Sequence, residues 1–223
     1  MKLATLVPVL NRPRNVAPLV ESFKASGAPG SLWFIVQRSD TAEMEAVQAV
    51  EANYLPVDDD VTTWPQKINH AVRMVTADWY LFCADDVRFH PGWWEATTKA
   101  RRQFKVIGTN DLTNPRVTSG DHATHPLVEG RYARMVHKVD GKPGPLHEGY
   151  HHWYVDDEFI GTAKARRVWT PCLDAVVEHF HPYWEKAEWD DTYTLGEAHS
   201  AEDKAEFRRR LGMIEDLFRV AEV

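Results

Sequence analysis

Blocks of hydrophobic residues recur along the first half of the chain and predict strands that alternate with helices. Apolar runs at 2–10, 32–37, 54–57 and 79–83 predict four strands. Apolar residues with helical spacing at 16–24 and 64–75, and a helix that begins near Thr41 behind the capping residue Asp40, fill the intervals. Alternating strands and helices imply a three-layer α/β/α domain with a largely parallel sheet.

The second half has a looser pattern. A strand is predicted at 105–109, a helix at 154–165 and a strand at 168–177. Between them, 110–149 is rich in Gly, Pro, His and Thr with little periodicity, and we expect a binding loop or lid there. The end of the chain, 200–223, predicts an amphipathic helix that packs through its apolar residues Phe207, Leu211, Ile214, Leu217 and Phe218.

Length and composition indicate one soluble domain. The 223 residues are 43% hydrophobic and 26% charged, with no apolar run long enough to span a bilayer and no signal peptide, so we expect a cytoplasmic protein without a membrane partner. Cys83 and Cys172 suit buried free thiols. A net charge of -7 gives no basic footprint for nucleic acid, whereas nine Trp and eleven His offer stacking surfaces, metal ligands and acid/base groups.

The stretch WYLFCADDVRFHPGWW, residues 79–94, carries the first candidate chemistry. It runs an apolar strand directly into Asp85 and Asp86. The carboxyl ends of strands are where open α/β sheets bind ligands, and two adjacent carboxylates there can hold a divalent cation. The alternative is a solvated turn, because Asp also favours turns.

Four pieces, read in order, resemble a known family. They are LVPVLNRP at 6–13, WPQKINHA at 64–71, the strand with its Asp-Asp and PGWW, and DDEF at 156–159 followed by HFHP at 179–182. Together they resemble GT-A type glycosyltransferases, in particular small inverting bacterial and phage enzymes that use nucleotide-sugar donors. The resemblance covers about residues 3–184. It implies a Rossmann-like three-layer fold with a mixed, mostly parallel sheet, and the host cytoplasm as the location if the gene is phage-borne.

The resemblance also implies how the single domain, 1–223, is divided and where the donor binds. Residues 1–109 correspond to the nucleotide-sugar half, 110–199 to the acceptor and metal half, and 200–223 to the C-terminal helix. Donor-binding roles fall on Pro8, Asn11, Arg12, Asp60, Lys67, Asn69 and Asp85.

The same resemblance implies a divalent metal, Mn²⁺ or Mg²⁺, that neutralises the diphosphate leaving group. Its ligand in the DxD-type motif corresponds to Asp86, while Ala84 stands where the family has its first acid. A late histidine often completes the ligand set, which favours His181 and then His179. Trp189-Asp190-Asp191 is expected to close over the donor.

The catalytic base of the family aligns with Asp156. Val155 replaces the acidic residue that normally precedes it, so Asp157 stays a second candidate. Either carboxylate could instead only cap the helix that begins there. No zinc-hydrolase motif is present, because His122-Ala123-Thr124-His125 lacks the Glu of HExxH.

The resulting hypothesis is a metal-dependent glycosyltransferase that moves a sugar, with inversion, from a nucleotide-diphosphate donor to an acceptor hydroxyl. A UDP-sugar is favoured as donor, and the acceptor is a protein, a modified DNA base, a glycan or a small molecule. The alternative is an inactive nucleotide-sugar or carbohydrate-binding module of the same fold.

Overall fold

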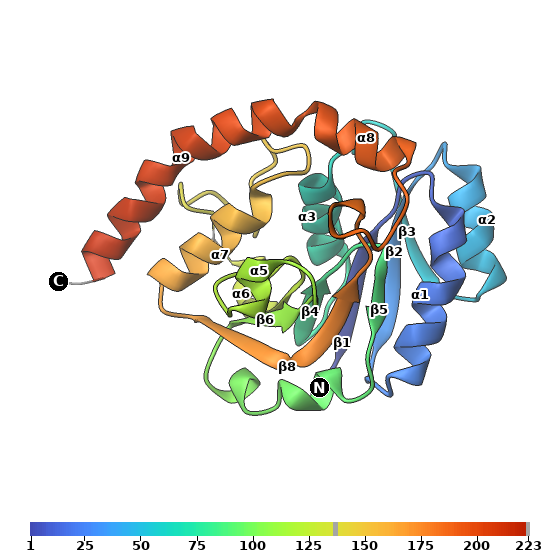
Figure 1. Cartoon of the computed structure of the whole chain (residues 1–223), viewed down its shortest axis with the longest axis horizontal. Helices are drawn as coiled ribbons and strands as arrows, with labels where there is room; N and C mark the ends of the chain where they lie inside the picture. Colours follow the sequence, from blue (N-terminus) through green and yellow to red (C-terminus); the bar gives the residue numbers. More distant parts are fainter. Residues whose placement is uncertain (136–137, 222–223) are drawn as a thin grey trace.

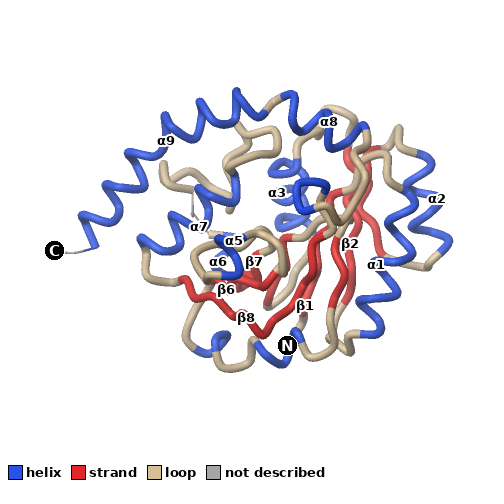
Figure 2. Tube along the Cα trace, viewed as in Figure 1, coloured by secondary structure: helices blue, strands red, loops and turns tan. Residues whose placement is uncertain are grey.

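A computed structural model of the chain describes residues 1–135 and 138–221. Its centre is a mixed eight-stranded sheet of order β3-β2-β1-β4-β7-β6-β8-β5, with helices on both faces (Figures 1 and 2). The strands are β1 Leu3–Pro8, β2 Ser31–Gln37, β3 Asn53–Val57, β4 Trp79–Phe82, β5 Val87–Phe89, β6 Val106–Asn110, β7 Pro126–Glu129 and β8 Trp169–His179.

The helices form the outer layers. The described α-helices are α1 Pro13–Ala25, α2 Thr41–Ala49, α3 Trp64–Met74, α4 Trp93–Ala96, α5 Pro115–Thr118, α6 Gly130–Arg134, α7 Val155–Ala165, α8 Asp191–Ala198 and α9 Ser200–Ala221, with 3₁₀ turns at Ala100–Arg102 and Pro182–Trp184. Residues of α1, α2 and α4 join the core on one face of the sheet, and residues of α3, α6 and α7 join the core on the other. The predicted three-layer α/β architecture is confirmed.

Strand β4 shows why the centre of the sheet was predictable. Trp79 and Leu81 pack into the core under α1, while Tyr80 and Phe82 point to the opposite core under α3. A strand covered on both faces needs apolar residues at every position, so it reads as an uninterrupted hydrophobic run. β1, β2, β3 and β4 pair in parallel, and their carboxyl ends therefore lie along one edge of the sheet.

The segment 110–149 is more regular than the sequence indicated. β7 lies in the middle of the sheet, antiparallel to both β4 and β6, and short helices α5 and α6 flank it. The expectation of one long loop is therefore wrong for 115–118 and 126–134. A four-residue strand is too short to show a period, which explains why it was missed.

The chain returns across the top of the molecule after β8 (Figure 1). Helix α9 confirms the predicted C-terminal helix, whose last two positions, 222–223, lie outside the described residues. Its expected apolar face is only partly buried, because Leu211 is 37% and Phe218 42% exposed. Polar side chains anchor the helix instead: the buried guanidinium of Arg210 lies 2.6 and 2.8 Å from the two carboxylate oxygens of Glu158 on α7.

Within the described residues, no helix is both long enough and apolar enough to cross a bilayer.

Candidate functional site

A cavity of about 440 Å³ opens at the carboxyl edge of the parallel strands. The cavity is lined by residues that follow β1 and β4, by the amino-terminal turns of α3 and α7 and by the end of β8. Helix α8 covers it. Ten of the predicted or newly found site residues line it: Pro8, Arg12, Lys67, Asp85, Asp86, His125, Asp156, His179, His181 and Tyr193. Chain segments more than 170 residues apart in sequence thus meet at one place.

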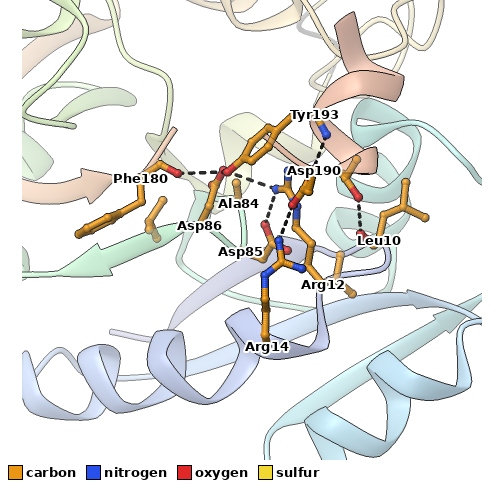
Figure 3. A network of polar contacts seen from close by, with 12 residues as sticks. Leu10, Arg12, Arg14, Ala84, Asp85, Asp86, Phe180, Asp190 and Tyr193 are labelled. Atoms are coloured by element: carbon orange, nitrogen blue, oxygen red, sulfur yellow. Dashed lines mark hydrogen bonds and ion pairs between the residues drawn. The ribbon is translucent and has the colours of Figure 1, made fainter. Parts of the chain in front are cut away.

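Arg12 is the centre of a buried ion-pair network (Figure 3). Its Nη1 lies 3.3 Å from Asp85 Oδ1 and 3.6 Å from Asp86 Oδ2. Its Nε and Nη2 each donate to Asp190 at 2.9 Å, and the guanidinium lies 3.6 Å from the ring centroid of Tyr193. The segment around Asp190 therefore lies over the carboxylates after β4. That it closes over the donor stays a prediction.

The two carboxylates that follow β4 have different environments. Asp86 accepts a hydrogen bond of 2.7 Å from the hydroxyl of Tyr193 and lies 3.3 Å from His179 Nε2. Burial alone would raise the pKa of Asp86, but the charges of His179 and Arg12 hold it well below the usual range. Burial and the charge of Asp86 raise the pKa of Asp85 to about 7.

These residues fit the divalent cation that the resemblance implies. Asp85 Oδ2 is buried and has no hydrogen-bond partner among the described residues, and Asp86 Oδ1 has only the imidazole of His179 beside it. Buried carboxylate oxygens without partners are costly, and a hard cation would satisfy them. His181 lines the same cavity, with its Nδ1 accepting from the backbone N–H of Tyr183 at 3.2 Å. Burial, together with the charge of His179, lowers the pKa of His181 to about 4, so this imidazole is neutral. A cation at Nε2 would require the proton on Nδ1, and thus loss of the hydrogen bond from Tyr183.

Lys67 reaches the cavity from α3. Its side chain is buried, and Nζ donates to the carbonyl of Val9 at 2.7 Å. Burial lowers its pKa to about 8. A diphosphate in this cavity would meet the cations of Lys67 and Arg12.

A second pair of carboxylates lies at the start of α7. Asp156 Oδ2 lies 2.9 Å from His122 Nε2, and its Oδ1 accepts the backbone N–H of Asp157 at 3.0 Å. Asp157 instead pairs with Arg116 at 2.6 Å. Only Asp156 of this pair lines the cavity, so the geometry favours Asp156 over Asp157 as a base that could reach a substrate.

Three residues predicted to bind the donor lie outside the lining of the cavity: Asn11, Asp60 and Asn69. The amide of Asn69 instead holds the loop before α7, bonding the carbonyl and N–H of Leu146 and the carboxylate of Glu148. Residues two apart on a helix point about 200° apart, so Lys67 and Asn69 cannot face one cavity. We leave all three residues out of the proposed site.

The sequence had not indicated the residues that complete the site. Tyr193 lies 107 positions from its partner Asp86, and His122 lies 34 positions from Asp156. Within the described residues, two groups of three side chains come close enough to share a metal ion: His122 with Asp156 and Asp157, and His151 with His199 and Glu202 at the α8–α9 junction. Arg116 already neutralises the first group, and the imidazoles of the second stack in parallel, so we assign neither a cation.

No family model and no curated protein sequence matches this chain. Solved structures do. Glucosyl-3-phosphoglycerate synthase from Mycobacterium tuberculosis, in complex with Mn²⁺, UDP-glucose and phosphoglyceric acid, is 12% identical, with a TM-score of 0.63 over 95% of this chain and 80% of that chain. S. aureus TarS 1–349 in complex with UDP-GlcNAc is 12% identical, with a TM-score of 0.61 over 85% of this chain.

The chain spans 59–62% of the length of the TarS 1–349 structures. At identities this low, the structural similarity establishes the fold alone, and the activity has to be argued from the residues of the site. Strand order, the layers of helices and these similarities agree with one another. The chain therefore has the GT-A glycosyltransferase fold.

Proposed function

We propose that the protein is a metal-dependent glycosyltransferase that moves a sugar from a nucleotide-diphosphate donor, a UDP-sugar, to an acceptor hydroxyl with inversion. One observation carries the proposal: the carboxylates Asp85 and Asp86, which suit a cation, and the carboxylate Asp156, which suits a base, line a single cavity. In the same fold, the synthase described above binds Mn²⁺, UDP-glucose and an acceptor.

Asp86 with His179 and His181 would hold Mn²⁺ or Mg²⁺, with His179 giving up its proton to ligate. Asp85 would contribute its free oxygen to the ion or to the ribose. When bound, the cation supplies positive charge to the diphosphate as the glycosidic bond breaks. Lys67 and Arg12 add fixed positive charge beside it, in a cavity where burial strengthens each interaction. Pro8 and Val9 shape the floor of the donor site.

Asp156 would remove the proton of the acceptor hydroxyl while that oxygen attacks the anomeric carbon. The pKa of Asp156 lies below its usual range because the charge of His122 and hydrogen bonds outweigh the effect of burial. An ionised carboxylate at neutral pH meets the first requirement of a general base. Trp153 and Tyr183, which also line the cavity, offer flat faces for a sugar or another ring of the acceptor.

A donor screen tests the proposal. Thermal unfolding is recorded with a panel of nucleotide-sugars, each with and without Mn²⁺, and we expect an upward shift for UDP-sugars that requires the metal. Donor hydrolysis then measures turnover without knowledge of the acceptor, and NMR of the released or transferred sugar gives its anomeric configuration.

The screen also separates the alternative function. The inactive binding module would be favoured if donors bind with the metal but are neither hydrolysed nor transferred to protein, DNA, glycan or small-molecule acceptors. Ala84, which stands in place of an acid, supports this alternative. Absence of any shift with every donor would contradict both functions.

A further inference from the structure

His122 is a buried histidine outside the set of residues that the proposed reaction uses. It lies between α5 and β7 with 2% of its surface exposed. Its Nε2 is 2.9 Å from Asp156 Oδ2. Building on the proposed function, we propose that His122 is a positioning residue that keeps Asp156 ionised and aimed at the acceptor hydroxyl.

The contacts of Asp156 leave one lone pair of each oxygen for a substrate. His122 engages Oδ2 and the N–H of Asp157 engages Oδ1. A carboxylate has about four acceptor positions, so two contacts fix the plane of the group without saturating it. About a quarter of the Asp156 side chain remains exposed, on the lining of the cavity. The carboxylate is thus fixed by His122 and the N–H of Asp157, while its remaining lone pairs are accessible from the cavity.

The contacts of His122 point to the same role. Its Nδ1 is buried and has no hydrogen-bond partner among the described residues, so Asp156 is the polar group that holds this imidazole. A buried polar atom without a partner destabilises the folded state. An apolar side chain of similar size would fill the space without that cost, so packing does not explain a histidine here.

The charges around the pair decide which group carries the proton. The titratable groups on neighbouring elements are Asp157, Arg116, His152 and His125. Asp157 and Arg116 neutralise each other, and His125 is buried and uncharged. Burial would lower the pKa of His122, yet the attraction of Asp156 raises it above the ordinary value. The same attraction lowers the pKa of Asp156. Each member of the pair thus favours the charged form of the other, an imidazolium facing a carboxylate.

The test compares His122→Gln, which keeps an N–H donor but no charge, with His122→Leu, which keeps neither. Removing the cation raises the pKa of Asp156, so the acid limb of the pH profile of kcat moves to higher pH in both variants. We expect kcat to fall about 10-fold for Gln and about 100-fold for Leu, while the Kd for the UDP-sugar with Mn²⁺ stays within about 2-fold.

A matched control is available in His90→Gln. His90 Nε2 also lies 2.8 Å from a carboxylate, that of Glu178, but outside the cavity lining, so its substitution should leave the pH profile in place. An acid limb that does not move in His122→Gln overturns the inference even if kcat falls, because the loss then comes from packing.

An NMR titration of the imidazole signals makes the inference testable without turnover. We expect the pKa of His122 above that of a free histidine, and lower in Asp156→Asn. A His122 signal that titrates normally and ignores Asp156→Asn overturns the inference. Failure of every donor to react, with the coupled titration intact, would instead overturn the proposed function and leave the His122–Asp156 pair established.

Discussion

Two pairs of adjacent aspartates lie at the cavity, which Asp85, Asp86 and Asp156 line, and the surroundings of the two pairs are similar. In each pair one carboxylate contacts a histidine and the other an arginine. After β4, Asp86 contacts His179 and Asp85 contacts Arg12, which also lies 3.6 Å from Asp86. At the start of α7, Asp156 contacts His122 and Asp157 contacts Arg116. In both pairs the pKa of the aspartate beside the histidine is lowered, and that of its neighbour is raised. The histidine thus determines which member of the pair is ionised first.

The pairs differ in exposure. The side chains of Asp85 and Asp86 are each 6% exposed, whereas that of Asp156 is 25% exposed. Deep burial keeps water away from the carboxylates Asp85 and Asp86 and so strengthens their attraction for a cation, which in turn can bind a diphosphate. A partly open carboxylate can receive a proton from a substrate that arrives and leaves. One local arrangement therefore supports two chemical roles because burial differs.

The largest expected effect comes from Asp156→Asn. The amide keeps the shape of the side chain but cannot accept a proton, so we expect kcat for transfer to fall about 10²–10⁴-fold with donor Kd unchanged. Steady-state kinetics and calorimetric donor binding measure the two quantities. Asp157→Asn is the matched control and should cost less than about 10-fold, because its carboxylate faces Arg116. Equal losses in the two variants would reassign the base.

Asp86→Asn tests the other pair and should show the opposite division. Loss of the ionised ligand should weaken Mn²⁺ binding at least about 10-fold, and with it the metal-dependent thermal shift caused by the donor. Mn²⁺ binding can be followed by EPR without any substrate. A variant that keeps full Mn²⁺ affinity and Mn²⁺-dependent donor binding would remove the metal from this pair.

The sequence predicted the half of the fold in which local pattern carries the information. Strands covered on both faces are apolar at each position, so β1, β2 and β4 were found with nearly their observed bounds. β5 and β7 have three and four residues, too few to show a period, and their places in the sheet depend on β8 and β4, which lie far away in sequence.

The aspartate pairs of the site were visible in the sequence, but which side chains they contact was not. Both Asp-Asp steps stand at the end of a strand or the start of a helix, which is a local signal. Arg12 lies 73 positions from Asp85, and no spacing rule joins them. Asn69 could have been removed from the donor site at once, because helical geometry turns it away from Lys67.

A smaller effect is expected at α8, whose Tyr193 contacts Asp86. Asp190 caps α8, accepting the N–H of Tyr193 at 3.0 Å, and ties it to Arg12. Asp190→Ala should speed hydrogen exchange of the amides in 191–198 roughly 5- to 10-fold, since a lost cap costs about 1 kcal/mol. The exposed neighbour Asp191 provides the control Asp191→Ala. Unchanged protection in Asp190→Ala would show that α8 is held by other contacts.

An effect on stability is expected at Lys67, whose charge interacts with that of Asp85. Burial lowers its pKa from 10.5 to about 8, so the folded protein releases near pH 8 a proton that the unfolded chain keeps to about pH 10.5. The unfolded chain binds more protons between these values, and stability relative to Lys67→Met therefore rises with pH across this window. The penalty for burying the charge is complete below pH 8.

Urea unfolding at pH 7 and at pH 10 measures this difference. We expect the free energy of unfolding of wild type minus that of Lys67→Met to be about 1–3 kcal/mol more favourable at pH 10. At pH 7, where Lys67 is protonated, Lys67→Met should lose donor affinity. Lys105→Met, at a half-exposed ion pair with Glu129, is the control for loss of a surface lysine. If the difference between wild type and Lys67→Met does not change between pH 7 and pH 10, the charge of Lys67 is compensated in the folded state. Lys67 would then already neutralise part of the charge of Asp85 and Asp86 before any donor binds.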